Sequence, residues 1–119
     1  MQISEQTGEE GIVVLDLEGR FDFSSRKAFK DTVERIQKEG CSHIIINMDR
    51  VSFVDSSALG LLVIASQNLK CKHAQLSIVN PQPYVRQVLD LANVPKMVPV
   101  YSSLNEAKQQ SPSPATATS

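Results

Sequence analysis

Asp55, Ser56 and Ser57 have the residue types and spacing that could most clearly do chemistry. They follow one apolar stretch and precede another, so we expect them in a turn that leads from a buried strand into a helix. Unpaired amide groups at a helix start can accept an anion. An Asp before two serines is also a common helix cap. The residues alone therefore leave two interpretations open, a structural cap and an anion-binding turn.

A Cys-x-His pattern occurs twice, at Cys41 and His43 and again at Cys71 and His73. If the strands that follow are parallel neighbours, the four side chains would share one end of a sheet and could ligate zinc. The spacing matches no usual zinc-ligand pattern. We therefore expect buried thiols, surface histidines and no metal site.

Catalysis by a serine nucleophile has little support in the sequence. The nucleophile elbow Gly-x-Ser-x-Gly is absent, and neither His43 nor His73 has an obvious acid to orient it. A Walker-type glycine loop for ATP phosphates is absent as well. We therefore predict a protein without catalytic activity and without a cofactor.

Strands and helices must position the candidate turn, and hydrophobic periodicity predicts where they lie. Residues 12–17 alternate as in a strand that ends at Gly19. From Ser24 the apolar residues recur at helical spacing, up to a C-terminal cap at Gly40. Residues 43–48 are apolar on both faces, which is typical of a strand covered by helices.

The predicted helix at residues 56–70 is more apolar than its length requires. A helix on a sheet needs one buried stripe, whereas this one has nearly two. The surplus must contact either a neighbouring helix or a partner protein. Its apolar residues are Leu59, Leu62, Val63 and Leu69 on one stripe, with Leu61, Ile64 and Ala65 beside them.

The remaining segments complete an α/β chain with one mixed sheet. They are a short strand near Ile3, a strand at 75–79, a helix from Pro83 to about Leu91, an edge strand at 98–101 that contains Pro99, and a short helix with a capping box at Ser103 and Glu106. We predict a single domain at residues 1–108, with about five strands and about four helices. The polar tail at residues 109–119 is expected to be disordered.

Composition and charge argue against two kinds of partner. The 119 residues carry a formal net charge of -1, which leaves no basic excess for a nucleic acid backbone or an anionic membrane. A small basic cluster at Arg26, Lys27 and Lys30 is a solvated face or a contact for acidic groups of a partner. Because the first residues do not form a signal peptide, we expect a cytoplasmic protein that binds neither nucleic acid nor membranes.

The sequence Phe-Val-Asp-Ser-Ser-Ala-Leu-Gly at residues 53–60 closely resembles the Asp-Ser-Ser-Gly-Leu-Gly signature of STAS domains of the anti-sigma-factor antagonist (anti-anti-sigma factor) family. The Gly-Arg-Phe-Asp segment at residues 19–22 resembles a second landmark of that family. The predicted order of elements fits the family over roughly residues 2–108. This resemblance implies a single STAS-like domain.

The resemblance implies a binding module and not an enzyme. When unphosphorylated, such a protein docks an anti-sigma factor that is a serine kinase of the GHKL type, and so releases the sigma factor. The kinase phosphorylates the serine after the motif's Asp, which is Ser56 here, and a PP2C-type serine phosphatase resets the protein. We expect a monomer when free. The residues that the resemblance assigns to partner binding are Asp22, Asp55, Ser56, Ser57, Ala58, Leu59 and Leu61.

Ala58 departs from the family pattern, which usually has Gly at this position. Ala is the better helix former by about 0.8 to 1 kcal/mol, so it should make the first turn firmer. It also adds a methyl group where a kinase or phosphatase must come close. A STAS scaffold without phosphorylation therefore remains an alternative.

A two-component receiver domain is the alternative from another class, since it has a similar length and an Asp after a central strand. It would need paired carboxylates after the first strand and a Lys after the last one. Asp16 and Glu18 come too early for this role, and Lys96 precedes the last strand. This alternative is therefore less favoured.

Overall fold

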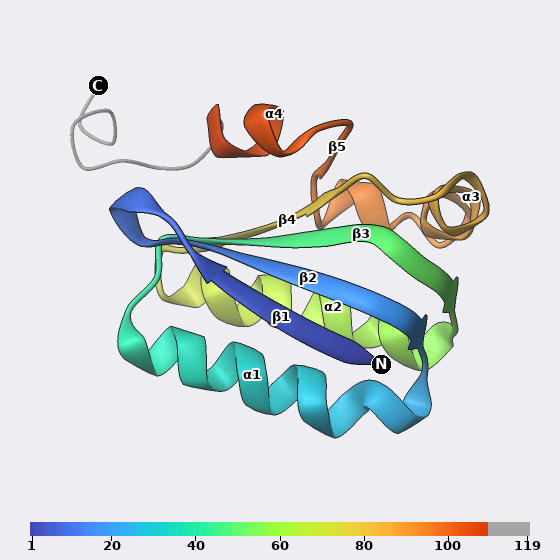
Figure 1. Cartoon of the computed structure of the whole chain (residues 1–119), viewed down its shortest axis with the longest axis horizontal. Coiled ribbons are helices and arrows are strands. Elements are labelled where there is room, and N and C mark those ends of the chain that lie inside the picture. The colour runs from blue at the N-terminus through green and yellow to red at the C-terminus, as the bar shows by residue number, and fades with distance from the viewer. Residues whose placement is uncertain (110–119) are drawn as a thin grey trace.

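Apolar strands form the centre of the computed structural model, which describes residues 1–109. Five strands lie side by side in chain order, and β1 is antiparallel to β2 while the other neighbours are parallel (Figure 1). The predicted mixed sheet is therefore confirmed. The strands are β1 (Gln2–Thr7), β2 (Ile12–Phe21), β3 (His43–Val54), β4 (Gln75–Val79) and β5 (Val100–Tyr101).

Four α-helices lie within the described residues and cover both faces of the sheet. Figure 1 shows α1 and α2 beneath one face and α4 against the other. Single turns of 3-10 helix, η2 (Phe23–Ser25) and η3 (Val94–Lys96), precede α1 and follow α3. The helices are α1 (Arg26–Glu39), α2 (Ser56–Cys71), α3 (Pro83–Leu91) and α4 (Leu104–Gln109).

Each face of the sheet carries an apolar cluster. The larger cluster joins Leu15 of β2 to Phe29 of α1 and Leu62 of α2, with further buried residues from α3. The smaller cluster lies under Ala107 of α4. Ile45 at the centre of β3 is fully buried between the two layers. This burial confirms that residues 43–48 are apolar on both faces because helices cover both.

Two strands are longer than the sequence pattern predicted. β3 continues beyond Met48 to Val54, and β2 continues through Gly19 to Phe21. Gly19 has a φ of 104° at an irregularity in the register, which a glycine accepts without steric cost. The strands then pair again where Phe21 and Val54, both buried, lie opposite each other. Asp55 therefore follows the strand directly and not through a turn.

The boundaries of α1 agree with the sequence pattern at one end. Gly40 caps its C-terminus with a φ of 86°, as predicted. Its N-terminus differs from the prediction. The helix was expected to begin at Ser24 but begins at Arg26, because Phe23–Ser25 form a 3-10 turn.

Two C-terminal elements, β5 and α4, differ in detail from the prediction. The edge strand is confirmed but contains only Val100–Tyr101. Ser103 caps α4 through the amide of Glu106, and the carboxylate of Glu106 accepts mainly from the amide and the hydroxyl of Ser102 and also interacts with the amide of Ser103. Gln109 is the last residue of α4, so it does not belong to the predicted tail, and residues 110–119 of that tail lie outside the described residues.

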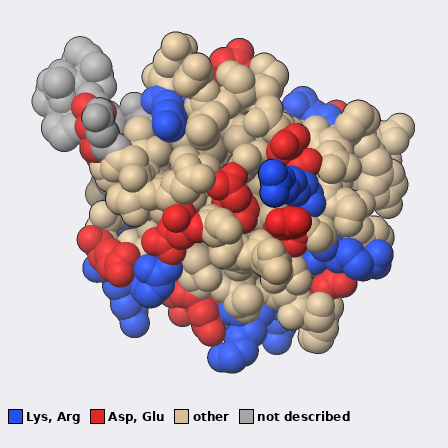
Figure 2. Space-filling model, in the orientation of Figure 1, with Lys and Arg blue, Asp and Glu red and all other residues tan. Residues whose placement is uncertain are grey.

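Charged side chains are mixed over the surface of the molecule. Figure 2 shows acidic and basic groups interspersed on one face, without a broad area of one sign. Long-range steering of a highly charged partner is not favoured on that face. Within residues 1–109, no helix is long and apolar enough to cross a membrane.

Candidate functional site

Asp55 joins the start of α2 to the turn that precedes α1. Its Oδ1 accepts a hydrogen bond from the amide of Ala58 at 2.9 Å, which caps the helix. Its Oδ2 accepts from the amide of Phe23 at 3.0 Å. The Asp55 amide donates to the carbonyl of Phe21 at 3.3 Å. The capping role is therefore present, and the same side chain also fixes a second segment beside the helix start.

Asp22 lies in that second segment, as the N-cap of η2. Its Oδ1 accepts from the amide and the hydroxyl of Ser24, at 3.1 and 2.5 Å. The hydrogen bond from the Ser24 hydroxyl is the main cause that lowers the pKa of Asp22, and Arg20 at 3.6 Å lowers it further. An ionised carboxylate therefore lies on the segment that Asp55 fixes beside the serines. The structure brings together the two sequence motifs that were singled out.

Ser56 and Ser57 form the first positions of α2. Ser56 is exposed and Ser57 is half-buried. Within residues 1–109 neither hydroxyl has a hydrogen-bond partner, so both are available for reaction or binding. The amide groups of the first helical turn lack acceptors inside the helix and favour an anion nearby. An exposed hydroxyl at such a position can carry a negatively charged group without disturbing the core.

Ala58 is fully buried, and its methyl group packs in the large core. The expectation that this methyl group would meet a partner is therefore wrong, because the first helical turn directs it toward the sheet. Leu59 and Leu61 are half-buried and pack against the same core. They can offer only part of their side chains to a partner.

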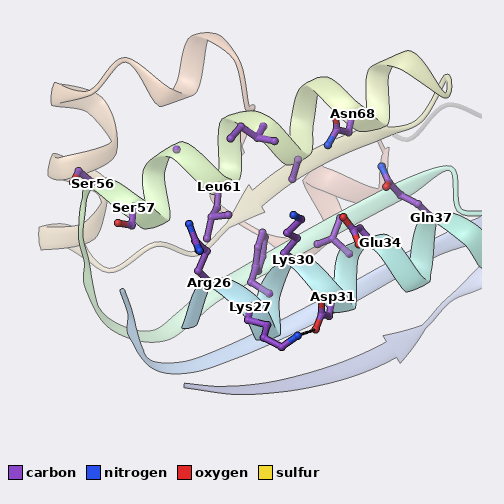
Figure 3. A pocket seen from close by; sticks show the side chains of 15 residues that line it. Arg26, Lys27, Lys30, Asp31, Glu34, Gln37, Ser56, Ser57, Leu61 and Asn68 are labelled. Carbon is purple, nitrogen blue, oxygen red and sulfur yellow. Dashed lines mark ion pairs between the residues drawn. The ribbon is translucent and has the colours of Figure 1, made fainter. Parts of the chain in front are cut away.

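A groove of about 580 Å³ runs between α1 and α2, and Ser56 and Ser57 line one end of it. In Figure 3, Arg26 extends from α1 toward Ser57 and Leu61 on α2. The basic cluster that the sequence indicated on α1 therefore borders the site. The surplus apolar surface of α2 is only partly covered, because Ile64 remains 55% exposed in this groove.

Phe23 is a site residue that the sequence analysis did not single out. Its side chain is 62% exposed, its amide binds Asp55, and the guanidinium of Arg26 lies 5.0 Å from its ring centroid. The only feature of the sequence that could have indicated Phe23 is its position directly after Asp22. Aromatic residues are enriched at protein interfaces. The exposed ring of Phe23 therefore adds a surface available for contact beside the serines.

The two Cys-x-His pairs do not form a common site in the part of the chain that the structure describes. No group of three or more potential ligands occurs among residues 1–109. His43 is fully buried, with Nε2 2.6 Å from Ser77 Oγ, and Cys71 is exposed. The expected surface position of His43 and burial of Cys71 are therefore wrong, because β4 covers the histidine and α2 ends at the cysteine.

Comparison with known proteins identifies the family. Residues 4–107 match the STAS domain, which is most of the chain. The chain therefore belongs to the STAS domain family, and the receiver-domain alternative is excluded.

Three relatives illustrate the match. A STAS-domain containing protein of Pseudomonas aeruginosa (strain UCBPP-PA14) is 31% identical over 68% of this chain and 79% of its own length. An anti-sigma F factor antagonist of Paenibacillus polymyxa is 26% identical over 78% of this chain and 80% of its own length. The unphosphorylated structure of the anti-sigma factor antagonist SpoIIAA has a TM-score of 0.78 at 24% identity, and covers 92% of this chain and 95% of that one. This structural similarity supports the fold.

Proposed function

We propose that the chain is an anti-sigma-factor antagonist. The first turn of α2, which begins at Ser56, docks an anti-sigma factor. The observation that carries the proposal is the geometry of Asp55, which presents an exposed Ser56 at a helix start and holds the Asp22 segment beside it. The relative from Paenibacillus polymyxa is named as an anti-sigma F factor antagonist, which supports the same role. The docking surface consists of Asp22, Phe23, Ser56, Ser57 and the exposed part of Leu61.

The partner is a serine kinase of the GHKL type that phosphorylates Ser56. Ser56 is the better acceptor because it is exposed, whereas Ser57 is half-buried beside the groove. A protein of the same fold, SpoIIAA, has been solved in a phosphorylated form, which supports a phosphorylation step in this family. A PP2C-type serine phosphatase removes the phosphate and restores docking.

Phosphorylation switches the interface and leaves the fold intact. A phosphate adds about -1.5 to -2 charges at the start of α2, where a helix favours an anion by about 0.3 to 1 kcal/mol. Asp55 opposes it by a similar order, so the two effects nearly cancel in the free protein. In a docked complex the same charge must be desolvated or face like charge, which costs several kcal/mol. Partner binding is therefore lost first.

The chain itself acts as a non-catalytic module in this scheme. The nucleotide is bound by the kinase partner, and the phosphoryl group passes from ATP to the Ser56 hydroxyl with release of ADP. Autophosphorylation of the purified chain from ATP would contradict this assignment.

Phosphosite mapping tests the proposal directly. The protein is incubated with its GHKL-type kinase and ATP, and the phosphopeptides are identified by mass spectrometry. We expect phosphate on Ser56, and we expect Ser57→Ala to remain a substrate while Ser56→Ala does not. Phosphate found only on Ser57, or phosphorylation of Ser56→Ala at the wild-type rate, would refute the assignment.

A further inference from the structure

The groove between α1 and α2 has an apolar floor that the fold leaves open. Phe29 and Val33 of α1 form the buried part of this floor, and Ala65 of α2 lies opposite them. Ile64 and half-buried Leu61 extend the apolar surface outward along α2. An exposed isoleucine beside a concave apolar surface is available to contact another molecule.

The rim of the groove is cationic at the end that holds Ser56. Lys27 forms an ion pair with Asp31 at 3.3 Å, which Figure 3 shows as a dashed line. Arg26 and Lys30 have no carboxylate partner within residues 1–109. Arg26 contacts the Phe23 ring but forms no ion pair, and Glu34 lies one turn beyond Lys30, so positive charge without an ion pair lies on the Ser56 side of Glu34. This distribution is complementary to acidic groups at that end.

Gln37 lines the other end of the groove with a polar atom that lacks a partner. Its Nε2 is buried and has no acceptor among the residues that the structure describes. A buried donor without an acceptor is unfavourable, and it would be satisfied if the side chain turned toward an oxygen that a ligand supplies. A peptide carbonyl is an acceptor of this kind.

From these three features we propose that the α1–α2 groove is a docking site for an acidic amphipathic peptide segment of a partner protein. Apolar side chains of the segment contact Ile64 and Leu61, and its acidic residues lie against Arg26 and Lys30. The Gln37 side chain turns into the groove, and its Nε2 then donates to a carbonyl of the segment. This inference goes beyond the proposed phosphorylation switch, since it requires neither the kinase nor a phosphate.

A peptide fits the groove better than an acyl chain with an acidic head group. An acyl chain would leave the Gln37 donor without an acceptor, and it is usually enclosed, whereas Lys30, Glu34 and Ile64 on the rim are exposed. Two neighbouring helices also form the kind of surface that receives the apolar face of an amphipathic helix.

The test uses a phage-displayed library of random peptides of about 16 residues, selected on the full chain. Enriched peptides are synthesised with a fluorescent label, and their binding is measured by fluorescence anisotropy. We expect enriched sequences that combine acidic residues with two or more large apolar residues. Ile64→Glu and Lys30→Glu should each weaken binding about tenfold or more, because each places a negative charge in the contact.

Matched controls carry the same changes outside the groove. Lys38→Glu lies on the last turn of α1, and Leu91→Glu lies at the end of α3, where the leucine is 81% exposed. Both should bind the peptides within about twofold of the wild type. Gln37→Met should weaken peptide binding while it raises the melting temperature of the free protein, since it removes the buried donor without a partner.

Three results would overturn the inference. The first is the absence of enriched peptides, and the second is enriched peptides whose binding is equal in Ile64→Glu and Leu91→Glu. The third is saturable binding of sodium oleate in the groove, followed by chemical shift changes at Ile64 and Leu61, together with no peptide binding there. That third result would assign the groove to a lipid.

Discussion

At the scale of single residues, Asp55 has more than one structural role. Its two carboxylate oxygens accept from amides that are far apart in the sequence, those of Phe23 and Ala58. A helix cap alone would need only one of these bonds. The second bond explains how the Asp22 segment is held beside the serines, so Asp55 positions the surface that we propose for docking.

Replacing Asp55 should therefore lower both stability and docking. We expect Asp55→Ala to reduce the free energy of unfolding by about 1 to 2 kcal/mol, because the Ala58 amide loses its cap. Urea denaturation followed by circular dichroism measures this change. Asp55→Asn is the matched control, since its amide oxygen can still cap the helix but its NH2 group cannot accept from the Phe23 amide, so it should recover only part of the loss. Equal free energies of unfolding for Asp55→Ala and the wild type would show that the hydrogen bonds of Asp55 do not contribute to stability.

His43 predicts a specific dependence of stability on pH. Burial lowers the pKa of His43 from 6.5 to about 4 in the folded protein. Between these values the unfolded chain binds a proton that the folded chain does not, so stability is fully present above about pH 6.5 and falls as the pH falls to 4. The loss should approach about 3 kcal/mol at pH 4, from 1.36 kcal/mol per pKa unit.

Urea denaturation at a series of pH values between 4 and 7 measures this loss of unfolding free energy. His43→Gln should flatten the curve over that range, whereas His73→Gln should leave its shape unchanged. A wild-type free energy of unfolding that stays constant from pH 7 to pH 4 would contradict the burial of a neutral His43.

At the scale of elements, α2 combines a core role with a surface role. Its buried side chains fill the core beneath the sheet, while its first turn and its groove side remain accessible. The buried methyl group of Ala58 belongs to the first of these roles. We therefore expect Ala58, where the family usually has Gly, to affect stability and not the approach of the proposed kinase.

Ala58→Gly tests that division of roles. It should lower the free energy of unfolding by about 1 to 2 kcal/mol, from lost helix propensity and a lost buried methyl group. Phosphorylation of Ser56 by the kinase should continue at a similar rate. Thermal melting and a kinase assay on the same preparation measure both quantities. A large gain in phosphorylation rate at unchanged stability would instead show that the methyl group obstructs the kinase.

The elements were predictable where their cause is local in the sequence. The period of Phe29, Val33 and Ile36 predicted α1, and the apolar run at residues 43–48 predicted a buried strand. The length of β3 was not predictable, because residues 49–54 pair with β2 only after a register irregularity. The buried His43 contacts Ser77 of the neighbouring strand β4, 34 positions away, and no local pattern contains such a contact.

The candidate site was predictable in part for the same reason. The motif contained Ser56 and Asp55, and the pairing of Phe21 with Val54 then brings the Asp22 segment to them. The groove was not predictable, because it depends on how α1 and α2 pack beside each other. Its unpaired donor, Gln37, has no distinguishing feature in the sequence.

At the scale of the whole molecule, the proposed switch requires a fold that tolerates a charge on its surface. The Ser56 side chain lies outside both apolar clusters, and the core residues of α2 begin at Ala58. Mixed surface charges on the face in Figure 2 offer no strong opposing field. The energetic effect of a phosphate is therefore expected at the docked interface and not in folding.

The most direct test is the affinity of the kinase partner for two forms of the same protein, with serine or genetically encoded phosphoserine at position 56. Isothermal titration calorimetry should show binding that is weaker by two orders of magnitude or more in the phosphorylated form, at about 1.4 kcal/mol for each factor of ten. Both forms should have similar melting temperatures and circular dichroism. Equal affinity of the two forms, or unfolding of the phosphorylated form, would contradict the proposed interface switch.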